Sequence, residues 1–85
     1  MKKTPYFENI ILTVREEIRR NLSYVEKAIS EPHTTETQED GRTRRWIYVP
    51  SEEKYMRVIV EPDGETVHNA FLDRDFTRKQ RRMDR

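Results

Sequence analysis

The residues of this chain that can do chemistry are histidine, arginine and tyrosine. The segment "ETVHNAFLDR" places His68 on a predicted strand and Arg74 just beyond its end. Histidine transfers protons near neutral pH, and arginine stabilises charge that develops on phosphate oxygens. Such groups suit cleavage of RNA without a metal, in which the 2′-hydroxyl attacks the neighbouring phosphorus. The predicted catalytic set is His68, Arg57, Arg74 and Tyr55.

Aromatic and basic side chains form a second group. They come from the predicted strand "RTRRWIYV" and from the basic end "TRKQRRMDR". Exposed aromatic rings stack on unpaired bases, and arginine binds phosphate. The predicted nucleic-acid-binding residues are Arg44, Trp46, Tyr48, Arg78, Lys79, Arg81 and Arg82. The alternative is that the rings only pack across strands, that His68 is a surface residue and that the basic end is a solvated surface.

Several kinds of site have no support in the sequence. The chain has no cysteine, which excludes a disulfide scaffold, a thiolate zinc site and a cysteine nucleophile. The two histidines and the scattered carboxylates lack metal-ligand spacing. Both glycines belong to turns rather than to a phosphate-binding loop. We therefore expect no metal and no cofactor.

The composition suits one small domain. The chain has 85 residues, of which 33% are hydrophobic and 39% are charged, so it buries a modest core. A partner chain or a second copy in a homo-oligomer would add buried surface. The formal net charge is only +1, so the basic patches are local. We expect a cytoplasmic protein, because the N-terminus lacks a signal-peptide pattern and no segment is long enough to span a membrane.

The clearest helical pattern covers residues 14–30. Ser23, followed three residues later by Glu26, has the spacing of a capping box that starts a new helix. Pro32 ends the pattern, because the residue before a proline is disfavoured in a helix. We therefore favour two helices, or one helix kinked at 21–23, over a single helix. The segment before them is either a short strand or the opening of a helix.

After the proline the sequence takes on the pattern of strands. The predicted strands are "HTTETQ", "RTRRWIYV", "KYMRVIV" and "ETVHNAFL", and the "DG" pairs at 40–41 and 63–64 predict two-residue hairpin turns. The fold class is α+β, with one or two short N-terminal helices on one face of a curved antiparallel meander of about four strands, and with an extra N-terminal strand as an option. Residues 1–76 form the domain. Residues 77–85 form a basic tail, either frayed or a short helix.

A two-residue turn at 63–64 sets the predicted register of the last two strands. It pairs Val60 with Val67, Ile59 with His68, Val58 with Asn69 and Met56 with Phe71, and the loop before them pairs Tyr48 with Tyr55 and Trp46 with Arg57. One face is then aliphatic and includes Asn69, which needs a buried hydrogen-bond partner. The opposite face collects Arg44, Trp46, Tyr48, Tyr55, Arg57 and His68.

The order of elements resembles the small RelE/BrnT-like toxin superfamily over nearly the whole chain. The residues that carry this resemblance are "ILTVREEIRRNLSYVEKAISEP", "DGRTRRWIYV", "KYMRVIVEPDGETVHNAF" and the basic end. The chain is also similar to a group of small bacterial proteins with a "DGETVHNAF-DR-F" motif, here Asp63 to Phe76. The resemblance implies a type II toxin, a metal-independent ribonuclease that acts on mRNA and is neutralised by a cognate antitoxin. Arg57, His68 and Arg74 match in place and type, whereas Arg15 stands where related chains often have a histidine.

Three functions therefore stay open. The first is a toxin-like endoribonuclease. The second is a non-catalytic module that binds RNA or a protein through the aromatic and basic face of the sheet. The third is an accessory subunit whose polar face is simply a protein interface.

Overall fold

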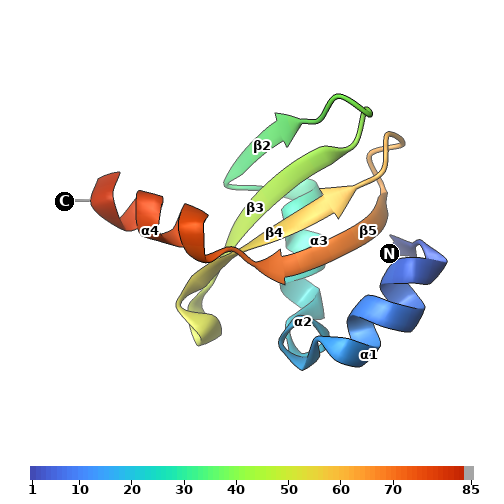
Figure 1. The fold of residues 1–85 in the computed structure, drawn as a ribbon, viewed down its shortest axis with the longest axis horizontal. Coiled ribbons are helices and arrows are strands. Elements are labelled where there is room, and N and C mark those ends of the chain that lie inside the picture. The colour runs from blue at the N-terminus through green and yellow to red at the C-terminus, as the bar shows by residue number, and fades with distance from the viewer. Residues whose placement is uncertain (84–85) are drawn as a thin grey trace.

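The computed structural model describes residues 1–83, which form a sheet with short helices on one face and a further helix at the C-terminal end (Figure 1). The strands are β1 (Lys2–Lys3), β2 (Thr34–Thr37), β3 (Thr43–Val49), β4 (Lys54–Val60) and β5 (Thr66–Leu72). The helices are the π-helical turn η1 (Phe7–Ile11), α1 (Leu12–Val14), α2 (Glu16–Arg20), α3 (Leu22–Ser30), the 3-10 turn η2 (Pro50–Glu52) and α4 (Arg74–Met83).

The sheet has five strands in the order β1-β5-β4-β3-β2. Strands β2 to β5 form the predicted antiparallel meander, and β1 adds a short N-terminal strand in parallel with β5. The segment "TPYFENIILTV", which the sequence leaves open between a strand and a helix, is helical in η1 and α1. The predicted α+β class is therefore confirmed. The sheet is mixed rather than purely antiparallel because β1 pairs in parallel.

The N-terminal helical region is broken at residue 21, within the predicted kink. Asn21 flanks both α2 and α3, and its backbone leaves the helical conformation with φ −117° and ψ 34°. Its side chain is buried and donates to the backbone oxygen of Glu17 at 2.8 Å and to Glu52 Oε2 at 3.0 Å. The single-helix alternative is therefore wrong. The predicted capping box at Ser23 is wrong too, because α3 already begins at Leu22 and the residue before it is Asn21.

The core lies between the helices and one face of the sheet. Helix α3 packs against β3 and β4, and η1 packs against β5. The buried cluster consists of Phe7, Ile11, Ile18, Val25 and Ala28 from the helices, and Ile47, Val49, Met56, Val58, Val60, Val67 and Ala70 from the strands. The strand members alternate along each strand, which leaves the other face to polar and aromatic side chains.

The predicted register is confirmed between β3 and β4, including the pairs Tyr48–Tyr55 and Trp46–Arg57. Between β4 and β5 it fails after the first pair. Val60 pairs with Val67 as predicted, but Ile59 pairs with Asn69, so His68 is the extra residue of a β-bulge.

The bulge exchanges the faces of the residues that follow it. The observed pairs are Val58–Ala70, Arg57–Phe71 and Met56–Leu72. Ala70 therefore lies in the core, whereas Asn69 lies on the face opposite the helices and not on the covered face as predicted. Burial favours this register, because the regular one would bury a side-chain amide where a methyl group now packs.

Both hairpin loops are longer than the predicted two residues. At the β4–β5 hairpin the N–H of Glu61 donates to the backbone oxygen of Thr66, which leaves residues 62–65 in the loop. Proline has no N–H to close a shorter turn. At the β2–β3 hairpin the N–H of Gln38 donates to the backbone oxygen of Arg42 at 2.8 Å, so residues 39–41 form the loop and Gly41 takes φ +89°.

Residues 77–83 of the predicted tail are helical and belong to α4, while 84–85 lie outside the described residues. The helix begins after Asp73, whose Oδ1 accepts the backbone N–H of Phe76 at 3.0 Å. Phe76 then lies on β3, where its ring stacks on Trp46. Helix α4 is therefore attached to the outer face of the sheet by its first turn, and Figure 1 shows the rest of it extending beyond the strands.

Candidate nucleic-acid interface

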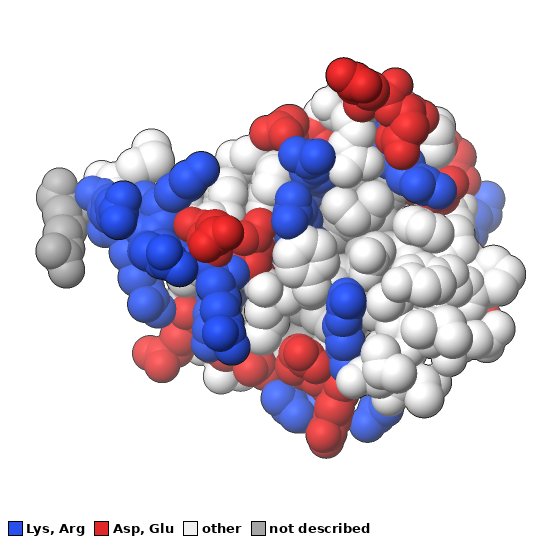
Figure 2. Space-filling model, in the orientation of Figure 1, with Lys and Arg blue, Asp and Glu red and all other residues white. Residues whose placement is uncertain are grey.

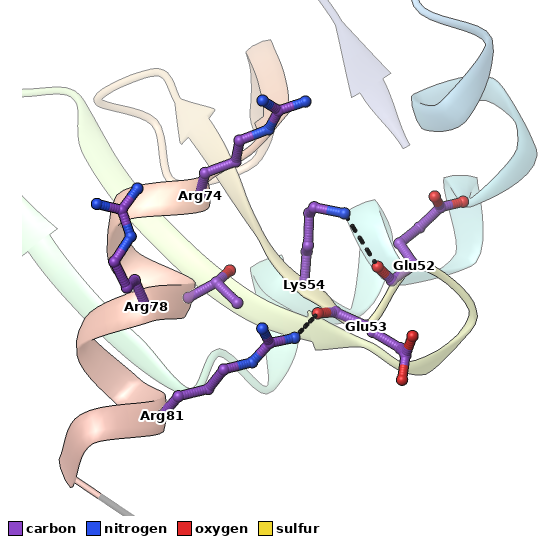
Figure 3. A pocket seen from close by; sticks show the side chains of 7 residues that line it. Glu52, Glu53, Lys54, Arg74, Arg78 and Arg81 are labelled. Carbon is purple, nitrogen blue, oxygen red and sulfur yellow. Dashed lines mark hydrogen bonds between the residues drawn. The ribbon is translucent and has the colours of Figure 1, made fainter.

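A groove lined by basic side chains lies between α4 and the turn that joins β3 to β4. We call it the α4 groove. Its volume is about 270 Å³, and it is lined by Glu52, Glu53, Lys54, Arg74, Thr77, Arg78 and Arg81 (Figure 3). The space-filling view also shows basic residues gathered over α4 (Figure 2). Four of the seven lining residues are cationic.

Helical spacing places three arginines on the same side of α4. Arg74, Arg78 and Arg81 are separated by four and three residues, so their side chains follow one stripe about 10 Å long. Thr77, on the inner side, fixes the helix to β4. Its hydroxyl donates to the backbone oxygen of Asp73 at 2.7 Å and accepts the N–H of Tyr55 at 2.8 Å. The position of the arginines is therefore set by a buried contact.

The cations of the groove are only partly neutralised. Arg74 makes no hydrogen bond or ion pair with any described residue. Arg78 forms an exposed ion pair with Asp75 at 3.3 Å, which contributes little. Arg81 donates to the backbone oxygen of Glu53 at 2.9 Å, an interaction that leaves its charge in place. Lys54 Nζ lies 3.5 Å from another backbone oxygen.

The two carboxylates beside the groove are turned away from the arginines (Figure 3). Glu52 Oε2 accepts hydrogen bonds from Arg20 at 3.1 Å and from Asn21 at 3.0 Å. The Arg20 bond, followed by the Asn21 bond, lowers the pKa of Glu52, so this carboxylate is charged and paired outside the groove. The groove therefore keeps an excess of positive charge.

A second hollow continues the basic surface toward the free edge of β5. It shares Lys54 and Arg74 with the α4 groove and adds Arg15 and one carboxylate, Glu17, beside Asn69, Phe71 and Leu72. Arg15 Nη1 donates to Asn69 Oδ1 at 3.0 Å and to the backbone oxygen of Ala70 at 2.7 Å. Arg15 thereby covers backbone groups that β1 is too short to pair.

The other flank of α4 carries mixed charge. It is lined by Thr34, Glu36, Arg44, Trp46, Arg57, Asp73, Asp75, Phe76 and Lys79. Arg44 pairs with Glu36 at 2.9 Å and Arg57 pairs with Asp73 at 3.4 Å. Lys79 makes no ion pair with a described residue. Because its arginines are matched by carboxylates, this flank attracts an anion less than the α4 groove does.

The predicted stacking platform at Trp46 is covered. Trp46 is only 5% exposed, because the ring of Phe76 stacks on it with centroids 4.7 Å apart and planes within 10°. Its Nε1 donates to Asp73 Oδ2 at 2.9 Å. The predicted register places this ring on the open face of the sheet, and the structure differs because Phe76 of α4 packs on it. Tyr48, in contrast, is 42% exposed.

Asp73 is the charged residue beneath this stack. Burial raises its pKa, but hydrogen bonds from the N–H of Phe76 and from Trp46 Nε1, together with the charge of Arg57, outweigh burial and lower it. The cationic partner of Asp73 is Arg57, at 3.4 Å, and not the neighbouring Arg74. The carboxylate thus links β3, β4 and α4.

The four predicted catalytic residues lie in different environments. Arg57 lies over the rings of Phe71, at 4.4 Å, and Trp46, at 5.9 Å. Tyr55 packs edge-on against Phe76. Arg74 lines the α4 groove and is the exposed member of the set.

His68 belongs to another group, at the β4–β5 bulge. Its Nδ1 lies 3.3 Å from Thr4 Oγ1 and 3.8 Å from Glu61 Oε1, and its ring packs against Tyr6. Glu61 is already paired with Arg42 at 2.7 Å. His68 therefore shares none of the contacts of Arg57.

A second histidine, at the start of the predicted strand "HTTETQ", belongs to an aromatic cluster beside α4. The ring of His33 lies 5.0 Å from that of Tyr55 and 6.2 Å from that of Phe76, and its Nε2 lies 3.3 Å from Gln80 Oε1. No pattern in the sequence indicates this cluster, because two of its members lie on α4 and the sequence left the conformation of that segment open.

Comparison with protein families, with curated proteins and with solved structures finds no match to this chain. Within residues 1–83, no group of three or more His, Asp or Glu side chains could hold a metal ion. No helix in the same part of the chain has both the length and the apolar character needed to cross a membrane.

Proposed function

We propose that this protein binds RNA through the α4 groove. One observation carries the proposal: Arg74, Arg78 and Arg81, spaced one helical turn apart on α4, line one groove together with Lys54, while the neighbouring carboxylates are turned away. Guanidinium groups bind phosphate oxygens in a bidentate manner. A row of such groups fits a chain of phosphates better than a single small anion.

RNA is the proposed ligand because the sequence resembles RNA-cleaving toxins, and we place its action in the cytoplasm. Phosphate contacts alone would also hold DNA, since they read charge and spacing. The binding test therefore includes DNA of the same sequence as a competitor. A higher affinity for RNA than for DNA supports the proposal. Equal affinity for the two would leave only the statement that the protein binds nucleic acid.

The test is a charge reversal with a matched control. Arg74→Glu should weaken the binding of a fluorescent single-stranded RNA about 10- to 140-fold, which corresponds to one lost charge-assisted contact of about 1.5–3 kcal/mol. Lys27→Glu on α3 makes the same change of charge at an exposed site far from the groove and should leave affinity nearly unchanged. An equal loss of RNA affinity in the two variants would mean that binding depends only on the net charge of the protein.

The salt dependence gives a second readout. Each phosphate neutralised on a single strand contributes a slope of about −0.7 to log K against log salt, so four cations predict about −3. Arg74→Ala should make this slope shallower by about 0.7. A slope near zero in the wild type would contradict an electrostatic groove.

The second candidate function is a metal-independent endoribonuclease, the toxin of a toxin–antitoxin pair. His33 supports it, because this histidine contacts Tyr55 and Gln80, which line a pocket together with Arg81, and a histidine can transfer a proton near neutral pH. His68 and Arg57 stay candidates from the resemblance.

Cleavage of end-labelled RNA in the presence of EDTA separates the two candidates. Loss of cleavage in His33→Ala, with RNA affinity retained, supports catalysis at α4, whereas the same loss in His68→Ala supports the bulge. The toxin function further predicts that expression arrests growth and that the product of an adjacent reading frame relieves it. Binding without cleavage leaves the non-catalytic RNA-binding function.

A further inference from the structure

A small aromatic pocket opens beside the α4 groove. Its volume is about 240 Å³, and its lining consists of Tyr48, Tyr55, Thr77, Gln80 and Arg81. It shares Thr77 and Arg81 with the groove, so a chain lying along the arginine stripe passes its mouth. The volume is below the roughly 300–1,000 Å³ of pockets for drug-sized ligands, and suits one flat ring system.

Tyr48 is the ring of this pocket that is open to a ligand. It is 42% exposed, and within the described residues its ring contact is with Tyr55, nearly edge-on at 5.2 Å. Trp46 and Phe76 are already stacked on each other. Within the described residues, the face of the Tyr48 ring therefore has no stacked partner, although its neighbour Tyr55 contacts it edge-on.

Two polar side chains frame the same pocket. The Nε2 of Gln80 has a 4.0 Å contact with Met83 Sδ, a weak acceptor, so it keeps an amide hydrogen that can be donated to a ligand. Arg81 keeps its charge, because it is bonded to a backbone oxygen. The three groups of this pocket fit the parts of one nucleotide. The aromatic ring can stack on the base, the amide can donate to the edge of the base, and the cation can bind the phosphate.

We infer that one unpaired nucleobase stacks on Tyr48 in this pocket, with Arg81 on the adjacent phosphate and Gln80 at the edge of the base. This inference rests on the proposed function and narrows the ligand to single-stranded nucleic acid. A base held in a duplex is already stacked and paired, and cannot enter without unpairing. The protein therefore binds single strands more tightly than duplexes, a preference that a charged groove alone gives only weakly.

The experiment compares Tyr48→Ala and Tyr48→Phe with the wild type on a single-stranded RNA that carries one 2-aminopurine. Tyr48→Ala should weaken binding about 5- to 140-fold, the equivalent of roughly 1–3 kcal/mol for one stacked base. Tyr48→Phe keeps the ring and should stay within about twofold of the wild type. The 2-aminopurine should be quenched by the wild type and by Tyr48→Phe, and not by Tyr48→Ala.

Tyr6→Ala is the matched control, because Tyr6 is also 42% exposed but packs against His68 at the bulge. Its affinity should equal that of the wild type. Inorganic polyphosphate is a probe with charge and no bases. It should bind the wild type and Tyr48→Ala equally, while Arg74→Glu weakens it.

These probes separate failure of the pocket from failure of the groove. If Tyr48→Ala binds RNA as tightly as the wild type, or if duplex RNA binds as tightly as single strands, the pocket inference is overturned and the groove stands on the effect of Arg74→Glu. If the wild type binds neither RNA nor polyphosphate, both proposals fall. Should Tyr48→Ala fail to fold, an abasic oligonucleotide tests the wild type directly, and binding equal to that of the normal strand overturns the pocket.

Discussion

The ring of Phe76 lies on the ring of Trp46 with centroids 4.7 Å apart and planes within 10°. One residue comes from α4 and the other from β3, so the contact attaches the C-terminal helix to the sheet. Asp73 caps the helix and accepts the indole N–H of the same tryptophan. The basic stripe of α4 has a fixed position because the opposite side of the helix is held in this way.

Removal of this contact should release α4. Phe76→Ala should lower the free energy of unfolding by about 1–3 kcal/mol, from lost burial and stacking of a half-buried ring. The chain has one tryptophan, so its fluorescence should shift to the red as Trp46 becomes solvated. Urea unfolding and emission spectra measure the two effects. Met83→Ala, at a 74% exposed position of the same helix, should change neither.

The attachment of α4 should weaken in acid. The pKa of Asp73 is lowered below its ordinary value of 3.8 in the folded protein, so the carboxylate stabilises the fold above that pH. The contribution is lost as the pH falls from 3.8 through the lowered value. Tryptophan fluorescence between pH 6 and pH 2 should show the release, and Asp73→Asn should remove this part of the pH dependence. An identical profile in the variant would assign the transition to other carboxylates.

The loop between β4 and β5 should contain a carboxyl group with an unusually low pKa. The hydroxyl of Thr66, followed by the N–H groups of Glu65 and Thr66, lowers the pKa of Asp63 from 3.8 to about 2. Carbon-detected NMR titration should give this value directly. Thr66→Val should raise it toward 3.8, whereas Thr34→Val, at an exposed position of β2, should not. The stabilisation from Asp63 is present above 3.8 and is lost between 3.8 and about 2.

The helix break at Asn21 should be important for stability, and the predicted cap at Ser23 should not. Asn21→Ala removes a buried amide that contacts Glu17, Ser51 and Glu52, and should cost about 1–3 kcal/mol. Ser23→Ala, at an exposed position inside α3, should stay within about 0.5 kcal/mol of the wild type. Urea unfolding of both variants decides between the two capping positions. A larger loss of unfolding free energy in Ser23→Ala than in Asn21→Ala would support Ser23 as the helix cap instead.

Alternation and turn residues were enough to predict β3, β4 and β5, because one face of these strands is aliphatic and side chains alternate between the two faces. They were also enough for the β3–β4 register. They failed to predict the register after His68, because a bulge changes the register without changing the composition of the strand. The register depends on whether Asn69 or Ala70 lies on the buried face.

The part of the site that α4 forms could not be predicted from the sequence for a different reason. Helix α4 is amphipathic, but its residues are almost all polar, so the sequence did not show that Phe76 and Thr77 of its first turn pack on the sheet. Its anchor depends on Phe76 meeting a tryptophan some 30 residues earlier. The cluster of His33 with Tyr55 and Gln80 exists only once that helix is in place.

Helix α4 is fixed to the sheet on one side and carries like charges on the other. Arg74, Arg78 and Arg81 repel one another in the free protein, since like charges one helical turn apart are destabilising. If the groove binds a polyanion as proposed, the ligand would reduce that repulsion, and it would contact both the arginines of α4 and Lys54 of β4 only while the helix is docked. Binding would then stabilise the docked helix, with the ligand as the counter-charge of the arginine stripe.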